Sequence, residues 1–233
     1  YSPYQDKDLT DRRIFDSGDL ELCFGDTAMA LGDIERRCAE ILNDGKRPFL
    51  LGGEHLVTLG AVRAAVRKYP DLAVIHFDAH ADLRQDYLGA ELSHACVLRR
   101  CWELLGDGRI FQFGIRSGDR EEFAWGKEHV TTRKFDFQGL KECLETLNGR
   151  PVYFTLDLDV LDPSVFPGTG TPEAGGVTFD QLREAAQLVC SRADVIACDV
   201  NELSPPYDPS GISAMAACKI VREMLLAFPE KER

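Results

Sequence analysis

The sequence predicts an α/β fold in which helices cover both faces of a mainly parallel β-sheet. Short apolar runs alternate with amphipathic helical patterns from about Asp26 onward, and this alternation is typical of successive βαβ units. Acidic and imidazole side chains follow several of the apolar runs, where open parallel sheets bind their ligands. The 233 residues contain no internal repeat, low-complexity tract or linker, so we expect one domain over residues 1–233.

The order of the elements follows from apolar periodicity and stop signals. The first helix ends at an Asn-Asp-Gly stop signal at residues 43–45, and its apolar face carries Leu31, Ile34, Cys38, Ile41 and Leu42. Strands are expected over residues 48–51, 72–77, 109–113, 152–156 and 195–199. Later helices are expected over residues 56–68, 94–105, 119–125, 139–147, 179–190 and 212–228. His129, just before a Val-Thr-Thr run, is expected on a peripheral strand.

The composition narrows the class of ligand. The net charge is −12, from 27 basic and 39 acidic residues, which argues against a nucleic-acid partner because phosphates need a basic surface. The same charge favours a cationic small-molecule substrate. No apolar run approaches the roughly 20 residues that span a bilayer, and the start does not resemble a signal peptide. No membrane partner is therefore expected.

The eight cysteines predict a reducing compartment. None forms a CxxC pair, and Cys38, Cys143, Cys190 and Cys198 fall on predicted helices and strands. Unpaired cysteines in this setting are typical of small buried hydrophobes, so we expect a cytoplasmic location. The chain begins at Tyr1 rather than Met, in a segment containing Pro and Asp, and we expect an N-terminal portion to be missing.

The strongest functional signal is the sequence Asp-Ala-His-Ala-Asp at residues 78–82, directly after an apolar strand. Extended residues two apart face the same side, so the three polar side chains are expected to point into one site. Strand ends near residues 52–55 and 157–159 add further His and Asp residues. The sequence therefore predicts a two-metal site. Its candidate ligands are His55, Asp78, His80, Asp82, Asp157 and Asp159.

Charge and ligand type restrict the metal. Two divalent ions would balance four carboxylates, so that neither partner is buried without compensation, whereas the carboxylates alone would repel one another and raise their pKa values. An oxygen-rich site with some imidazole and no thiolate suits Mn²⁺ better than structural zinc. A close metal pair can lower the pKa of a shared water and deliver hydroxide to an unreactive carbon.

Other polar residues each support two interpretations. For His76, a histidine satisfied in the core is favoured over a ligand. His94 opens a helix after a polar loop that begins at the metal motif, and we favour proton transfer or substrate positioning over a plain helix-start residue.

Residues 168–173 lack a Walker lysine and GxGxxG spacing, which excludes nucleotide binding. Thr169 and Thr171 there either line the substrate mouth or belong to a plain surface loop. Glu202 is a candidate cation-binding residue or a solvated loop acid.

Three segments, at residues 52–55, 78–82 and 156–163, resemble the three signatures of the ureohydrolases, the family that contains the arginases and agmatinases. The resemblance runs from about Asp16 to the C-terminus and keeps motif order and spacing. Features within residues 82–100, 168–173 and 204–209 are most similar to those of agmatinases. Glu54 stands where many relatives have Asp, and it is not expected to bind metal.

The resemblance implies a three-layer α/β/α fold, two Mn²⁺ per chain and hydrolysis of a guanidino group to urea and an amine, with agmatine as the first expected substrate. One ion would be bound by His55, Asp78, Asp82 and Asp157, and the other by Asp78, His80, Asp157 and Asp159. Glu202 would hold the guanidinium charge, Asp82 would orient the attacking hydroxide, and His94 would pass a proton to the leaving amine. Homo-trimers or homo-hexamers are usual in the family.

Several alternatives stay open at this point. Aminopropylagmatine, guanidinobutyrate and arginine differ from agmatine only beyond the guanidino group, and Arg84 leaves room for a substrate that bears a carboxylate. A single-zinc polyamine deacetylase shares the fold but would not need Asp82 together with His55. A dinuclear phosphoesterase would need more His ligands than five histidines offer. A non-catalytic, metal-binding member of the family is the remaining alternative.

Overall fold

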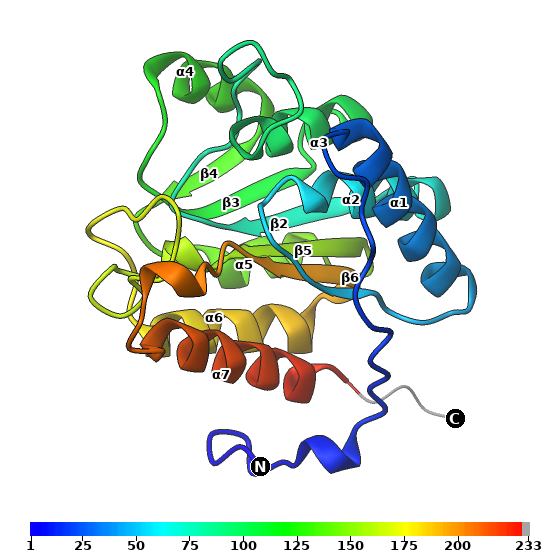
Figure 1. Cartoon of the computed structure of the whole chain (residues 1–233), viewed down its shortest axis with the longest axis vertical. Coiled ribbons are helices and arrows are strands. Elements are labelled where there is room, and N and C mark those ends of the chain that lie inside the picture. Colours follow the sequence, from blue (N-terminus) through cyan, green and yellow to red (C-terminus); the bar gives the residue numbers. More distant parts are fainter. Residues whose placement is uncertain (230–233) are drawn as a thin grey trace.

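The computed structural model describes residues 1–229 and contains one six-stranded sheet in the order β1-β6-β5-β2-β3-β4, with all neighbouring strands parallel. Figure 1 shows helices on both sides of this sheet, which confirms the predicted three-layer α/β/α fold. The strands are β1 (Phe49–Leu51), β2 (Ala73–Phe77), β3 (Ile110–Ile115), β4 (Thr131–Lys134), β5 (Pro151–Asp157) and β6 (Asp194–Asn201). The helices are α1 (Thr27–Asn43), α2 (Val57–Lys68), α3 (Val97–Leu105), α4 (Arg120–His129), α5 (Leu140–Thr146), α6 (Phe179–Arg192) and α7 (Ile212–Ala227). The last residues of the predicted domain, 230–233, lie outside the described part.

Two apolar layers hold the helices against the sheet. Helices α1, α2 and α3 pack on one face, where Leu59 joins a core with Val74 and Tyr153. Helices α5, α6 and α7 pack on the other face, where Phe77 and Leu182 belong to a second core. The central strand β2 is buried along its whole length, as expected of a parallel strand covered on both sides. Among the helices of residues 1–229, none is both long and apolar enough to cross a membrane.

Polar side chains at the helix starts explain where three helices begin. The carboxylate of Asp26 accepts a hydrogen bond from the third residue of α1. Asp119 and Glu122 form a reciprocal capping box at the start of α4, and Thr178 and Gln181 form another at the start of α6. Each pair satisfies backbone N–H groups that have no partner within the helix.

Besides shifts of a few residues at element ends, three features differ from the sequence prediction. The helix expected over residues 94–105 begins with a 3₁₀ turn, His94–Cys96, and α3 starts only at Val97. His129 is the last residue of α4 instead of a strand residue, because its ring stacks on Trp125 at 4.3 Å and its Nδ1 lies 2.7 Å from Asp107 Oδ1. Cys218 is exposed on α7, so burial does not explain every cysteine.

The topology brings the carboxyl ends of β1, β6, β5 and β2 side by side. The segments that follow these strands, at residues 52–55, 201–202, 157–159 and 78–82, therefore meet at one edge of the sheet. Gly52 allows the segment after β1 to pack directly against Asn201 at the end of β6, since a Cβ at residue 52 would lie 2.1 Å from Asn201 Oδ1. The fold thus gathers the motifs that the sequence separates by more than a hundred residues.

Candidate metal centre

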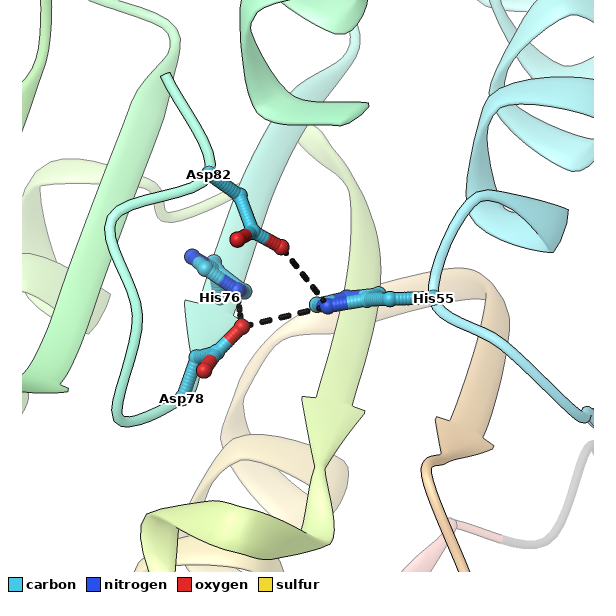
Figure 2. A group of neighbouring side chains, drawn as sticks. All are labelled: His55, His76, Asp78 and Asp82. Carbon is cyan, nitrogen blue, oxygen red and sulfur yellow. Dashed lines mark hydrogen bonds and ion pairs between the residues drawn. The ribbon is translucent and has the colours of Figure 1, made fainter. Parts of the chain in front are cut away.

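His55 is the meeting point of three carboxylates. Its side chain is 1 % exposed, and its Nδ1 lies 3.1 Å from Asp78 Oδ2, 3.1 Å from Asp82 Oδ2 and 3.3 Å from Asp157 Oδ2. Figure 2 shows the first two of these approaches, with the imidazole edge directed between Asp78 and Asp82. This buried nitrogen has no hydrogen-bond partner of accepted geometry within residues 1–229. A nitrogen facing several carboxylate oxygens is a suitable donor set for a divalent cation.

His80 forms a second set with the same Asp78. Its Nδ1 lies 3.0 Å from Asp159 Oδ2 and 3.5 Å from Asp78 Oδ1. The ligand atoms of Asp78, His80 and Asp159 all lie within 4.8 Å of one another, as do those of His55, His76, Asp78 and Asp82. One oxygen of Asp78 therefore faces His55 and the other faces His80. This arrangement is suited to two neighbouring cations that share one carboxylate.

Burial and mutual repulsion set the charges of this cluster as long as no cation is bound. Burial and the neighbouring Asp78 raise the pKa of Asp82 to about 7. Burial, followed by repulsion from the other carboxylates, raises the pKa of Asp157 and of Asp159. Burial opposes a charge on His80, but Asp159 and Asp78 outweigh it and raise the pKa of His80 to about 12. The cluster thus retains protons that divalent cations would displace.

A buried hydrogen-bond chain orients His55. Its Nε2 lies 2.8 Å from Thr155 Oγ1, and the Thr155 hydroxyl donates to Asp199 Oδ1 at 2.6 Å. Because the Thr155 proton is committed to a carboxylate, the hydroxyl oxygen accepts from His55 Nε2–H, which leaves the lone pair of Nδ1 facing the carboxylates. Asp199 is fully buried and also accepts from Thr58, Tyr153 and Asn201.

Thr155→Val is expected to weaken metal binding about 10- to 100-fold, the usual loss when a group that orients a metal-ligating histidine is removed. Valine keeps the shape of threonine but cannot accept from His55 Nε2, so the ring loses its fixed tautomer. The affinity would be measured by calorimetric titration with Mn²⁺. Thr155→Ser keeps the hydroxyl and serves as the matched control. Wild-type affinity in Thr155→Val would show that the chain to Asp199 does not orient His55.

His76 is fully buried beside the cluster, with protein partners for both ring nitrogens. Its Nε2 lies 2.8 Å from Asp78 Oδ2, and its Nδ1 lies 3.1 Å from Gln112 Nε2. Figure 2 marks the contact with Asp78 by a dashed line. The Gln112 amide can only donate from this nitrogen, so His76 accepts at Nδ1 and donates from Nε2 to Asp78. The geometry agrees with a satisfied core histidine that supports a ligand.

Two residues of the site lie in the left-handed region of backbone conformation, Asp82 at φ 55° and Glu202 at φ 65°. Such conformations cost about 1–3 kcal/mol for a non-glycine residue and cluster at functional sites. Glu202 is held there by two contacts. Its N–H donates to Gly53 O at 2.9 Å, and its Oε1 accepts from the N–H of His55 at 2.6 Å. Burial raises the pKa of Glu202.

The remaining predicted residues lie around this centre. Thr171 Oγ1 donates to Asp159 Oδ2 at 3.3 Å, and Thr169 is buried with an Oγ1 that lacks a partner within the described chain. Their role as substrate contacts stays a prediction. The guanidinium of Arg84 contacts Glu122 at 3.4 Å and Asp119 at 3.7 Å, so two carboxylates already offset part of its charge.

The sequence assigned no role to three residues that contribute to the site. Thr155 and Asp199 orient His55 from within strands. The carboxylate of Glu54 contacts both the backbone N–H and the ring of His94. The only sequence signal for Asp199 is a charged residue at the end of an apolar strand. Glu54 lies in the motif at residues 52–55, but the motif does not indicate a partner that is 40 residues away in the sequence.

Comparison with known proteins agrees with this geometry. The model of the Arginase family matches residues 1–227. The agmatinase of Bacillus subtilis is 49% identical over 231 residues, which cover 98% of this chain and 80% of that protein. The guanidinobutyrase of Pseudomonas aeruginosa is 35% identical, with 93% of this chain and 71% of that protein covered.

Solved structures give the same result. A protein from Clostridium difficile superposes with a TM-score of 0.95 at 48% identity, with 97% of this chain and 83% of that chain covered. The agmatine ureohydrolase of Thermoplasma volcanium superposes with a TM-score of 0.86 at 35% identity, with 97% and 77% covered. Motif order, fold and sequence identity lead to one conclusion: the chain belongs to the arginase family.

Proposed function

We propose that this protein hydrolyses the guanidino group of agmatine to urea and putrescine at a pair of Mn²⁺ ions. The observation that carries the proposal is Asp78, whose two oxygens face His55 at 3.1 Å and His80 at 3.5 Å, so that two cation positions share one carboxylate. The arginase family consists of binuclear-metal hydrolases, and relatives near half identity are agmatinases.

The donor atoms fit this pair of ions. His55, Asp78, Asp82 and Asp157 would hold one ion, and Asp78, His80, Asp157 and Asp159 the other. The buried, unpartnered Nδ1 of His55 supports the first set, and the carboxylate-rich composition without thiolate favours Mn²⁺. When bound, such a pair supplies hydroxide at neutral pH and stabilises developing negative charge.

The side chains of the chain itself would bind the substrate and handle its protons. Glu202, half-buried at the edge of the cluster, would pair with the planar guanidinium and hold its positive charge. Asp82 would accept a hydrogen bond that orients the attacking hydroxide. His94, whose side chain is 42% exposed at the rim, would pass a proton to the leaving amine.

The distal part of the substrate distinguishes the alternatives. Agmatine and aminopropylagmatine end in cationic amines, which suit a chain with a net charge of −12. Guanidinobutyrate is the second candidate because a guanidinobutyrase is 35% identical. Its carboxylate, like that of arginine, would need a free cation, and Arg84 is already paired with Glu122. A single-zinc deacetylase would leave the first donor set, in which His55 faces Asp82, without a use.

The decisive experiment is urea release by the Mn²⁺-loaded protein with agmatine, aminopropylagmatine, guanidinobutyrate and arginine as substrates. We expect agmatine to give the highest kcat/KM and the metal content to approach two ions per chain. Urea release that is highest with guanidinobutyrate would transfer the assignment to that substrate. No urea from any of the four compounds, with metal bound, would support a non-catalytic role.

The cellular setting belongs to the same proposal. Putrescine formation is a step of polyamine synthesis, and a cytoplasmic location agrees with eight free cysteines. The family resemblance supports a homo-trimer or homo-hexamer, which sedimentation would test.

A further inference from the structure

Glu54 makes two hydrogen bonds to one residue on a different segment. Its Oε1 accepts from the backbone N–H of His94 at 2.7 Å and lies 2.9 Å from the Nδ1 of the same histidine. Glu54 belongs to the loop between β1 and α2, whereas His94 opens the 3₁₀ turn before α3. The carboxylate therefore fixes both the main chain and the ring of His94.

This contact determines which ring nitrogen is free. An ionised carboxylate only accepts hydrogen bonds, so His94 donates from Nδ1 and its Nε2 is left for other partners. The bond to Glu54 also raises the pKa of His94 above its ordinary value, against the effect of partial burial. On the other side, the Tyr87 ring lies edge-on at 5.7 Å. Without Glu54, a half-exposed imidazole at the rim would have several rotamers and both neutral tautomers available.

The loop that carries Glu54 also contacts the other groups of the site. The next residue, His55, directs Nδ1 at three carboxylates and donates its backbone N–H to Glu202 Oε1 at 2.6 Å. Gly53 O accepts from the N–H of Glu202 at 2.9 Å. A single short loop thus fixes His94 relative to Glu202 and to the metal cluster.

We propose that Glu54 is a positioning residue that holds His94 with Nδ1–H on its carboxylate and Nε2 directed to the leaving amine. The imidazolium then gives its Nε2 proton to that amine and is left as the neutral Nδ1–H tautomer. The inference rests on the proposed function, in which His94 transfers that proton. Glu54 does not touch the substrate in this account, and it acts only through His94. Glu54 is unusual for a surface carboxylate, because its side chain is 48% exposed and yet makes two short hydrogen bonds to one residue, His94.

The kinetic test is a double-mutant cycle on the Mn²⁺-loaded protein. General acid catalysis contributes about 10²–10⁴-fold, so we expect Glu54→Ala to lower kcat about 10- to 100-fold, with KM changed less than threefold. The same substitution in a His94→Asn background is expected to cause less than a twofold further loss. Glu54→Gln keeps an acceptor oxygen and should lie between wild type and Glu54→Ala. Glu145→Ala, on the exposed surface of α5, is the control.

Two measurements separate this role from damage to the neighbouring metal ligand and from failure of the proposed function. Metal content should be unchanged in Glu54→Ala. In ¹⁵N-histidine NMR spectra of protein loaded with diamagnetic Zn²⁺, His94 should carry its neutral-form proton on Nδ1 in wild type and exchange between tautomers in Glu54→Ala. This readout needs no turnover, so it decides the contact even if wild type releases no urea. Full kcat in Glu54→Ala, equal losses in both backgrounds, or an unchanged tautomer would overturn the proposal.

Discussion

Asp157→Ala is expected to abolish both metal binding and urea release. Asp157 Oδ2 lies 3.3 Å from His55 Nδ1 at the carboxyl end of β5, and its carboxylate would be shared by both ions of the proposed pair. Its loss removes one donor from each set and one negative charge from a buried cluster. A cation there would lack a compensating charge, which is costly away from water. We expect no metal retained after gel filtration and at least a 1,000-fold lower kcat, of the order that catalytic metals supply.

The thermal stability of the variant distinguishes this loss from misfolding. Without metal, the raised pKa values of Asp157 and Asp82, the latter about 7, mean that folding disfavours the ionised carboxylates. The stability of the metal-free chain therefore falls as the pH rises from the unfolded aspartate pKa of about 3.9 through the folded pKa values. Removing Asp157 takes one of the mutually repelling carboxylates out of the cluster.

Melting curves near pH 8 with and without Mn²⁺ provide the measurement. Ligands that bind only the folded state raise Tm, so Mn²⁺ should raise the Tm of wild type and leave that of Asp157→Ala unchanged. The variant Asp157→Asn keeps the side-chain shape and should melt no lower than the metal-free wild type. Asp44→Ala, at the exposed end of α1, is the matched control. A Tm increase with Mn²⁺ in Asp157→Ala would remove Asp157 from the ligand set.

The fold was predictable from sequence because its strands and helices have strong local signals. The short run at residues 72–77, apolar except for His76, favours a strand buried on both faces, and β2 was placed to within one residue. The errors occurred where tertiary contacts override local pattern. His129 remains helical because its ring stacks on Trp125, and β3 continues past residue 113 because Gly114, at φ 88°, lets the strand bulge beside β4.

The candidate site was predictable to the extent that its residues follow strand ends. The candidate ligands sit in short motifs, and parallel topology alone brings such motifs to one edge. The supporting groups could not be found this way. Thr155 meets His55 across 100 residues, and Glu54 meets His94 across 40, so each contact depends on strand order and loop path. A threonine inside a strand and a glutamate in a loop are too common to predict such roles.

Glu202→Gln is expected to lower kcat/KM for agmatine while metal binding is retained. The carboxylate is half-buried at the edge of the cluster, and burial raises its pKa, so it gains from a cationic partner. Hydrogen bonds to charged groups contribute about 1.5–3 kcal/mol, so loss of the charge predicts a fall of roughly 10- to 150-fold in kcat/KM.

Both KM and kcat should change, because the guanidinium must be held during binding and during attack on its carbon. In the wild type, the backbone nitrogen of His55 lies 2.6 Å from Glu202 Oε1. Glutamine keeps an oxygen that can accept this hydrogen bond, so the loop that carries His55 should not move. Steady-state urea release and metal content per chain are the two measurements, with Glu145→Gln as the matched control. Loss of metal along with activity would mean that Glu202 acts on the position of His55 instead of on the substrate. Full activity with agmatine would remove Glu202 from guanidinium binding.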